Sequence, residues 1–416
     1  MDSIKLSICI PTFNRAAFLT KALTHVLNDC KFPFAYEVVV SDNASTDNTR
    51  DIVEQFREKG LPIHYFRQVE NVGYERNLTG VFRRGRGDYL VYLSDDDLLI
   101  PEAVVETVRY LDANPDATAA YAPWDLYDEV ARIKVAQFYA QSIDLKFAQR
   151  NFVEAFSFLV DNHIFPEIAI YRASALRSAM VPRYFCFWAF VYLAHFLDQG
   201  SVAFLARPFY RSVTVSSVRR DREQAGNEEV MVAWDRYRGG LEYFMGMAIG
   251  RSPTPMPPAQ VAAYTDMIKT FTLIRMSVAL RFWVARKDYL RSYELFCRLN
   301  FGGLHDNPTV QSLKGSLLLM VAVQTLARIA NATASVDRLV LAGVKDLPSL
   351  ESLLRELELE PRIAVTPEPP QPSAEDASRS IVFVAEDADR RRFLDRGYSP
   401  NLVLSEDDLV KTIIIR

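Results

Sequence analysis

The strongest constraint on the fold is an alternation of short apolar segments and amphipathic segments over the first part of the chain. The apolar runs Lys5–Ile10 and Glu37–Val40 have the length and composition of buried strands. Ala16–Leu27 and Thr49–Lys59 carry apolar residues three and four positions apart, as amphipathic helices do. Repeated strand–helix units predict an α/β fold, an open parallel sheet with helices on both faces. The pattern continues with strands at Pro62–Arg67 and Asp88–Leu93 and helices at Asn77–Arg84 and Ala103–Leu111.

Composition and charge narrow the class of protein. The chain has 416 residues, 49% hydrophobic and 24% charged, which excludes disordered, collagen-like and low-complexity proteins. The formal net charge of −4 shows no basic excess, so we expect no nucleic-acid partner. The four cysteines lie far apart without a CxxC pair, which argues against a disulfide framework or a structural zinc site and fits a reducing compartment.

The location of the protein is predicted from its apolar segments. The first apolar run stops at Pro11 and lacks the pattern of a signal peptide. Tyr184–Leu197 and Ser316–Ala327 are shorter than the roughly 20 residues that span a bilayer, and we interpret both as buried helices. We therefore expect a cytoplasmic protein. Peripheral contact at the inner membrane face stays open.

An acidic run, Asp95–Asp97, directly follows the predicted strand Asp88–Leu93. Three adjacent carboxylates at a strand end repel one another unless a cation is near. Their hard oxygens suit Mg²⁺ or Mn²⁺, and Mg²⁺ usually binds one or two carboxylates together with substrate phosphates. The alternative is a helix N-cap before Pro101, but a cap needs one Asp rather than three. The run therefore favours a site for metal and phosphate.

Polar residues also follow the other predicted strands, at Thr12–Arg15 and Ser41–Asn43. Ligands of open α/β sheets bind beyond the carboxyl ends of the strands, so we expect these groups to line one site. Asp42 could accept a hydrogen bond from a base N–H or a ribose hydroxyl. In Asn71–Asn77, Gly73 permits a tight loop and Arg76 could reach a diphosphate. The alternatives are a polar capping loop and a solvated surface arginine.

Together these segments resemble the family 2 glycosyltransferases, which have the GT-A fold. The resemblance covers about residues 5–125 strongly and 126–220 weakly. Within the family, the chain is most similar to enzymes that build bacterial surface polysaccharides, such as O-antigen transferases. The matching segments are SICIPTFNRAAFL, EVVVSDNASTDNT and NVGYERNLTGVFRRGRGDYLVYLSDDDLL, with the Pro101 that follows.

The resemblance implies a metal-dependent, inverting transfer of sugar from a nucleotide sugar to a hydroxyl of a glycan, a lipid-linked molecule or a protein. Asp96 would be the main ligand of Mg²⁺ or Mn²⁺, with Asp97 next to it. The metal would stabilise the leaving diphosphate while a carboxylate takes the proton of the acceptor hydroxyl. Asp42 would hold the base, Asp95 the ribose, and Arg76 would approach the diphosphate or the sugar. The implied nucleotide-sugar-binding residues are Pro11, Thr12, Asn14, Arg15, Asp42, Asn43, Asn71, Gly73, Arg76, Asp95 and Asp96.

The acceptor half departs from the family, whose members commonly carry an acid, often Glu-Asp, where the helix Phe187–Gln199 begins. Phe185–Trp188 has no acid. Glu167 and Asp198 are the candidates for the catalytic base, with Asp125 and other acids left open. Glu167 could instead pair with Arg172 or Arg183 and hold a strand. The alternative function is a catalytically reduced scaffold that binds nucleotide sugar or glycan in an assembly complex.

Beyond residue 224 the pattern changes twice. We expect a glycosyltransferase domain at 1–224 (donor half 1–125, acceptor half 126–224), an α-helical region at 225–335, and a small C-terminal α/β accessory domain at 336–416. The last domain has no glycine-rich phosphate loop, and we interpret it as an accessory or oligomerisation module. Its predicted strands are Arg338–Ala342, Arg362–Val365, Ile381–Ala385 and Leu402–Leu404, with a loop at Pro367–Ser378.

Overall fold

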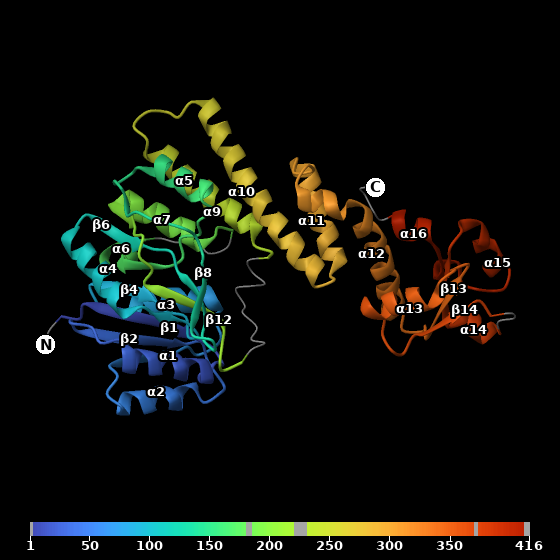
Figure 1. The fold of residues 1–416 in the computed structure, drawn as a ribbon, viewed down its shortest axis with the longest axis horizontal. Helices are drawn as coiled ribbons and strands as arrows, with labels where there is room; N and C mark the ends of the chain where they lie inside the picture. Colours follow the sequence, from blue (N-terminus) through green and yellow to red (C-terminus); the bar gives the residue numbers. More distant parts are fainter. Residues whose placement is uncertain (1–2, 180–184, 220–230, 370–372, 412–416) are drawn as a thin grey trace. The chain divides into compact units, whose positions relative to one another are not determined.

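The computed structural model describes residues 3–179, 185–219, 231–369 and 373–411 (Figure 1). The chain divides into two compact units, residues 1–272 and 273–416, and the boundary falls within helix α10 (Pro258–Ala285). Each unit has its own sheet and its own hydrophobic core. The domain boundaries expected at residues 224 and 335 stay predictions.

The first unit is built on an eight-stranded sheet with the order β3-β2-β1-β4-β10-β6-β11-β9. The first four strands are mutually parallel, as the strand–helix alternation predicted. Their carboxyl ends therefore meet at one edge of the sheet. These strands are β1 (Leu6–Thr12), β2 (Tyr36–Asp42), β3 (Ile63–Arg67) and β4 (Tyr89–Tyr92).

The second half of this sheet is mixed, because strands from beyond residue 125 join it in both directions. Strand β10 (Ala169–Arg172) lies between β4 and β6 (Ala117–Tyr121) and runs antiparallel to both. The start of β10 consequently lies at the edge where β4 and β6 end. Strand β11 (Ser201–Phe204) is parallel to β6, and β9 (Leu145–Phe147) is antiparallel to β11.

Helices cover both faces of the sheet, which confirms that part of the prediction. Helices α1 (Ala16–Asp29) and α2 (Thr49–Glu58) lie on one face and α3 (Tyr74–Arg84) on the other (Figure 1). The buried side chains of α1 recur at three- and four-residue spacing, as the amphipathic pattern predicted. The other helices of this unit are α4 (Pro101–Ala113), α5 (Phe152–Asp161), α6 (Ala173–Ser178), α7 (Trp188–Gln199) and α9 (Trp234–Arg251).

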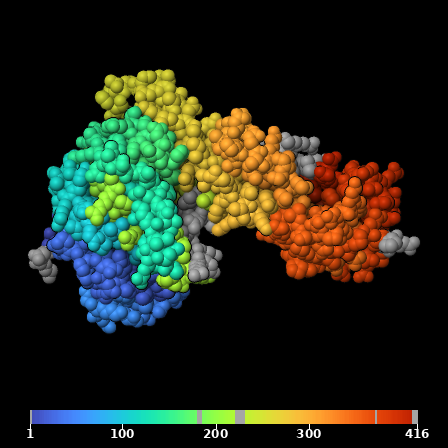
Figure 2. Space-filling model, in the orientation of Figure 1, coloured from blue at the N-terminus to red at the C-terminus, as the bar shows by residue number. Residues whose placement is uncertain are grey.

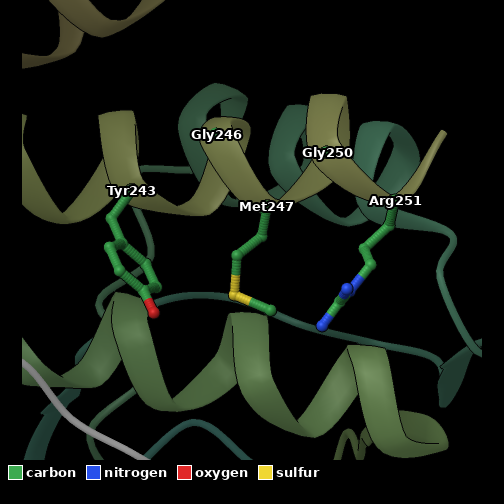
Figure 3. A pocket seen from close by; sticks show the side chains of 5 residues that line it. All are labelled: Tyr243, Gly246, Met247, Gly250 and Arg251. Atoms are coloured by element: carbon green, nitrogen blue, oxygen red, sulfur yellow. The ribbon is translucent and has the colours of Figure 1, made fainter.

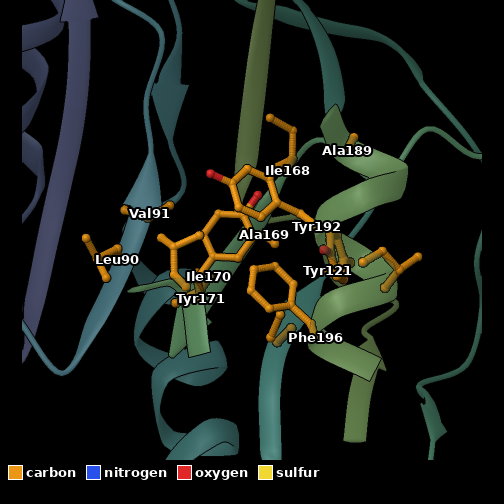
Figure 4. Packing of buried hydrophobic residues seen from close by; sticks show 14 of the residues in the cluster. Leu90, Val91, Tyr121, Ile168, Ala169, Ile170, Tyr171, Ala189, Tyr192 and Phe196 are labelled. Carbon is orange, nitrogen blue, oxygen red and sulfur yellow. The ribbon is translucent and has the colours of Figure 1, made fainter. Parts of the chain in front are cut away.

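Aromatic side chains fill the space between the middle of the sheet and α7 (Figure 4). The ring of Tyr121 lies 6.3 Å from that of Tyr171 in an edge-on arrangement, and the ring of Tyr171 lies 5.4 Å from that of Phe196. Eight side chains of α7 are buried. The interpretation of this apolar segment as a buried helix is therefore confirmed from residue 188 on, while Tyr184 lies outside the described residues.

A second, four-stranded sheet crosses the edge where β4 ends, with the order β5-β12-β7-β8. The sequence did not predict it, because β5 has only two residues and β8 is largely exposed. The segment around β8 forms part of the surface visible in Figure 2. Strand β5 follows the acidic run at once, so its partner β12 lies beside that run. The strands are β5 (Leu98–Leu99), β7 (Asp125–Asp128), β8 (Ile133–Gln137) and β12 (Tyr210–Val215).

The second unit confirms the predicted helices followed by a small α/β fold. Its four strands are parallel, in the order β14-β13-β15-β16. The predicted loop Pro367–Ser378 contains a short helix instead, because Ser373 and Asp376 form a capping box. The elements are α11 (Tyr289–Gly302), α12 (Pro308–Ala332), β13 (Arg338–Ala342), α13 (Leu347–Glu356), β14 (Ala364–Pro367), α14 (Ala374–Ser378), β15 (Ser380–Val384), α15 (Arg390–Leu394), β16 (Val403–Ser405) and α16 (Glu406–Lys411), with short 3₁₀ turns at Asp387–Asp389 and Pro400–Leu402.

Helix α12 is the one helix among those described that is long and apolar enough to cross a membrane, judged by length and composition alone. In the structure, 44% of its most apolar stretch is buried inside the protein. Core helices of globular proteins pass the same test, so this helix does not decide the location of the protein.

Candidate active site

Three of the predicted polar groups meet at the carboxyl edge of the first four strands. Thr12 is the register partner of Asp42 across β1 and β2, and both residues are buried. The Thr12 hydroxyl donates a hydrogen bond of 2.7 Å to Asp95 Oδ2 beyond the end of β4. The ends of β1, β2 and β4 therefore form one connected site, with Pro11 buried at its base.

Asp42 is fixed at the tip of β2 by its neighbours. The Tyr65 hydroxyl donates to Asp42 Oδ2 at 2.6 Å, and the Ser45 N–H donates to Oδ1 at 2.8 Å. Arg67 Nε lies 3.6 Å from Oδ2. Burial raises the pKa of Tyr65 strongly, and the hydrogen bond to Asp42 raises it further. The sequence analysis did not predict Tyr65 and Arg67 as site residues, although both lie on β3, the strand that pairs with β2.

Asn43 ties the next loop to this edge. Its side-chain Nδ2 donates to Asn71 Oδ1 at 2.7 Å, and its Oδ1 accepts from the Val72 N–H at 2.9 Å. The Gly73 N–H donates to the same Asn71 Oδ1 at 2.9 Å. Gly73 has a φ of 83°, in the region that favours glycine, which agrees with the tight loop expected there.

The loops after β1 and β2 are joined through Asn14. Its backbone is left-handed, with a φ of 52°, and its N–H donates to Ser45 Oγ at 2.8 Å. Asn14 Oδ1 accepts from the Thr46 N–H at 2.7 Å. Asn14 therefore holds two loops together in this structure, and this structural role stands beside the predicted contact with the donor.

Arg15 lies against two of the three acids. Its Nε is 2.9 Å from Asp95 Oδ1, and its Nη2 pairs with Asp96 Oδ2. The Ser94 hydroxyl donates to Asp96 Oδ1 at 2.6 Å. Burial raises the pKa of Asp95 to about 7; the positive charge of Arg15 opposes this shift and the negative charge of Asp96 adds to it. The acidic loop is thus held by a cation, as mutual repulsion of the carboxylates requires.

Asp97 makes its contacts with β12. The Tyr210 hydroxyl donates to Asp97 Oδ2 at 2.8 Å, and the Val213 N–H donates to Oδ1 at 2.8 Å. The Ser94 N–H donates to the same Tyr210 hydroxyl at 3.1 Å. Both oxygens of Asp97 therefore tie the acidic loop to β12, and this structural role stands beside the predicted role of Asp97 as a metal ligand. The sequence carried no signal for Tyr210, which is 113 residues away.

The residues at this edge fit a metal ion whose coordination is completed by phosphate oxygens of a bound molecule. Among the described residues, no group of three or more His, Cys, Asp or Glu side chains is arranged to hold a metal by itself. Asp95 and Asp96 nevertheless offer hard carboxylate oxygens, and they already bind one positive group, the guanidinium of Arg15. One or two carboxylates completed by phosphate oxygens is the usual environment of Mg²⁺.

Glu167 is brought to the same edge by the reversed strand β10. Ile170 lies opposite Val91 in antiparallel register, and continuing that register to the residues before β10 sets Glu167 opposite Ser94. The Glu167 carbonyl accepts from the Tyr171 hydroxyl at 3.3 Å. Arg172, one suggested partner of Glu167, instead donates from its Nε to the Ala117 carbonyl at 2.8 Å. The other, Arg183, lies outside the described residues.

The remaining acids are placed differently. Asp198 lies at the end of α7, just before β11, and therefore at the opposite edge of the sheet. It forms ion pairs of 3.0 Å with Arg150 and with Arg251, so neither its position nor its contacts support a role as the base. Asp125 is buried at the start of β7 and pairs with Lys134 Nζ at 2.6 Å.

Arg76 is exposed in the first turn of α3 and, within the described residues, has no ion pair. Its neighbour Glu75 pairs with Arg236 of α9, a contact that the sequence did not suggest. An arginine with this exposure, next to the Gly73 loop, can reach a ligand without giving up a partner.

A pocket of 410 Å³ lies elsewhere, where side chains of α9 point toward α7 (Figure 3). Tyr243 contacts His195 Nε2 through its hydroxyl at 3.0 Å, and Arg251 pairs with Asp198. The lining has no carboxylate and lies beside Asp198, so it is separate from the acidic edge. The lining residues are Tyr243, Gly246, Met247, Gly250 and Arg251.

Comparisons with known proteins bear on the family of this chain. The family model described as glycosyl transferase family 2 matches residues 7–178. The abequosyltransferase RfbV of Salmonella typhimurium is 36% identical over 112 residues, which cover 27% of this chain and 34% of that protein. The GalNAc(5)-diNAcBac-PP-undecaprenol beta-1,3-glucosyltransferase of Campylobacter jejuni is 34% identical over 102 residues, covering 24% and 32%. The chain thus spans about a third of the length of these curated relatives.

Among solved structures, S. aureus TarS 1–349 in complex with UDP-GlcNAc aligns with 15% identity and a TM-score of 0.44, over 68% of this chain and 88% of that one. A likeness at this level transfers no residue role. The family match covers the strands that carry Thr12 and Asp42 and the loop after β4 that carries Asp95. Residues 7–178 are therefore a family 2 glycosyltransferase domain, which confirms the resemblance that the sequence motifs indicated.

Proposed function

We propose that the protein is a metal-dependent, inverting glycosyltransferase that moves a sugar from a nucleotide sugar to a hydroxyl acceptor in bacterial surface glycan synthesis. One observation carries this proposal. Buried Asp42 and the Asp95–Asp96 pair, held by Arg15, lie on either side of Thr12 at the carboxyl edge of a family 2 glycosyltransferase domain. This is the edge where open α/β sheets bind their ligands.

The donor would lie along the connected strand ends. Asp42 keeps lone pairs for a base N–H, since each carboxylate oxygen can accept more than one hydrogen bond. Asp95 and Thr12 would receive the ribose hydroxyls. The loop of Asn71 and Gly73 would approach the diphosphate, with Arg76 neutralising its charge through a charge-assisted hydrogen bond.

Asp96 would hold Mg²⁺ or Mn²⁺ together with oxygens of the donor diphosphate, and Asp97 would fix the acidic loop from the side of β12. When bound, the metal supplies positive charge where the leaving diphosphate develops negative charge. The positioning role of Asp97 rests on its hydrogen bonds with Tyr210 and Val213, and its further lone pairs leave the predicted contact with the metal open.

Glu167 would be the general base. An alcohol holds its proton about as tightly as water does, so the acceptor hydroxyl needs a proton acceptor as it attacks C1. The register of β10 against β4 supports Glu167 over Asp198. The acceptor would be lipid-linked, a choice supported by the undecaprenol diphosphate in the name of the Campylobacter relative. Glycan and protein hydroxyls, peripheral membrane contact from the cytoplasm and a homo-oligomer stay open.

The alternative of a catalytically reduced scaffold is favoured by one observation. The first turn of α7 contains no acidic residue, where family members commonly carry one. Such a protein would bind nucleotide sugar at the same edge without turning it over.

A thermal-shift panel of UDP-, GDP- and dTDP-sugars with MnCl₂ or with EDTA tests the proposal. We expect one donor class to raise the melting temperature in MnCl₂, because a ligand that binds only the folded state stabilises it. Slow release of nucleoside diphosphate should follow, and Glu167→Gln should reduce it. A donor that stabilises the protein but is never turned over would favour the scaffold. No stabilisation by any donor would contradict both functions.

A further inference from the structure

The Arg15 side chain has an unusual position for a surface residue at the start of a helix. It lies directly before α1, and its guanidinium contacts the carboxylates of both Asp95 and Asp96. The side chain is 25% exposed, whereas the two carboxyl side chains are 6% and 8% exposed. Arg15 therefore lies between a nearly buried pair of negative charges and the solvent side of the site.

Arg15 occupies one of the two carboxylate oxygens of Asp96. Asp96 Oδ1 accepts from the Ser94 hydroxyl, and Oδ2 pairs with Arg15 Nη2. A divalent cation on Asp96 needs a carboxylate oxygen that faces the donor. The guanidinium holds such an oxygen in this structure, so a metal has to displace it or share Asp96 with a second positive charge. Two cations within about 4 Å repel each other even near a protein surface, and the double charge of the metal strengthens this repulsion.

A diphosphate changes this balance because guanidinium binds phosphate oxygens through two parallel hydrogen bonds. Apart from the two carboxylates, the contact of the Arg15 guanidinium within the described residues is with the ring of Phe18, whose centroid lies 4.4 Å away. The Arg15 side chain can therefore turn from the carboxylates to a diphosphate without unfolding any element. The donor would then bring the metal and remove its competitor in one step.

We infer that Arg15 is an internal counter-cation that competes with the divalent metal for Asp95 and Asp96 and moves to the donor diphosphate when the donor binds. The inference rests on the proposed function, because it takes the metal and diphosphate site from there. It adds that metal and nucleotide bind with strong positive coupling, each weak alone. Such a coupling is reciprocal: the nucleotide strengthens metal binding by the same factor as the metal strengthens nucleotide binding.

Direct Mn²⁺ binding to the full chain tests this inference. Free Mn²⁺ is measured by electron paramagnetic resonance at pH 7.5, with MnCl₂ alone and with UDP, GDP or dTDP. We expect wild type to bind Mn²⁺ weakly alone and at least about tenfold more tightly with one of the nucleotides. Arg15→Met should bind Mn²⁺ alone about tenfold more tightly than wild type and show a smaller gain from the nucleotide.

Matched variants separate the effect of Arg15 from a general change of charge. Arg15→Lys keeps the positive charge and should stay near wild type. Arg238→Met removes an arginine whose ion-pair partner, among the residues that the structure describes, is the exposed Glu242 on α9, and it should leave Mn²⁺ binding unchanged. Asp96→Asn added to Arg15→Met should abolish the gain. If Arg15→Met fails to fold, Arg15→Gln, which keeps hydrogen-bond donors, replaces it.

The two proposals fail in different ways. An Arg15→Met protein that binds Mn²⁺ no more tightly than wild type, while wild type binds Mn²⁺ with a nucleotide, would overturn the role of Arg15 and leave the proposed function in place. A wild-type protein that binds no Mn²⁺ with any of the three nucleotides would overturn the metal-dependent function itself.

Discussion

The donor half and the acceptor half of the first unit build their contacts in different ways. In the donor half, each polar residue follows its own strand, and parallel pairing of the strands brings Thr12, Asp42 and Asp95 together. The acceptor half instead contributes contacts that reach across to the donor half, as that of Tyr210 with Asp97 does. In parallel strand–helix repeats, functional residues follow the ends of the strands, so their positions can be found in the sequence. Where a reversed strand and a second sheet bring residues to the site, the positions depend on how the chain is connected in space.

The largest expected effect lies in the donor half. Asp96→Asn should lower turnover by about 10²–10³-fold, because it removes the carboxylate proposed to hold the cation at the leaving diphosphate. The measurement is release of nucleoside diphosphate in MnCl₂, with circular dichroism as the control for folding. Near wild-type turnover of this variant, or full turnover of wild type in EDTA, would mean that the site works without a metal.

The next effect tests the acceptor half. Glu167→Gln should lower the transfer rate by about 10²-fold or more while donor affinity stays near wild type, since Gln keeps the shape but cannot take a proton. Asp198→Asn is the matched control, because Asp198 lies at the other edge between two arginines, and its transfer rate should hardly change. If Asp198→Asn lowers the transfer rate and Glu167→Gln does not, Asp198 rather than Glu167 is the base.

Tyr210→Phe tests the contact that joins the two halves. Removing the hydroxyl leaves Asp97 Oδ2 and the Ser94 N–H each without that partner. We expect the free energy of unfolding to fall by about 1–3 kcal/mol and donor affinity to fall with it, because the acidic loop is less well held. Urea unfolding and donor titration measure the two. Lower stability with unchanged donor affinity would show that β12 does not position the acidic loop.

The smallest effect concerns the pH dependence of stability. The folded-state pKa of Asp95, about 7, lies above its ordinary value of about 4, so the folded state binds the proton more tightly than the unfolded state. The stability that this provides is present below about pH 4 and is lost as the pH rises through about 7. The Asp95→Asn variant does not lose stability in this way, because an amide side chain does not titrate. The melting temperature of this variant should therefore gain on that of wild type between pH 5 and pH 8, without metal or donor. If the melting temperatures of Asp95→Asn and wild type differ by the same amount at pH 5 and at pH 8, the pKa of Asp95 is not raised by burial.

The same comparison shows what the sequence could predict. Apart from the two-residue β5, the order of strands and helices through residue 113 followed from apolar periodicity, and the positions of Asp42 and Asp95 followed from the strand ends. Tyr65 and Arg67 could have been proposed, because they lie on the strand next to Asp42 with their side chains on one face. Their hydrogen-bond partners required the register.

Other features could not be derived from local patterns. The reversal of β10 depends on where the chain returns to the sheet, and strands as short as β5 carry no periodicity. The three acids Asp95, Asp96 and Asp97 look equivalent in sequence, yet Asp97 alone accepts from β12. That division of roles depends on Tyr210 and Val213, whose pairing with the acidic loop only the folded chain specifies.

The most direct test of the central claim is a calorimetric titration of the stabilising nucleotide sugar into the wild-type chain, in MnCl₂ and again in EDTA. The proposed function predicts saturable binding of one donor class in MnCl₂ and at least about tenfold weaker binding in EDTA, since metal and diphosphate occupy the site together. Binding that is equally tight in EDTA, or absent for every nucleotide sugar in MnCl₂, would contradict a metal-dependent donor site at the edge formed by Asp42, Asp95 and Asp96.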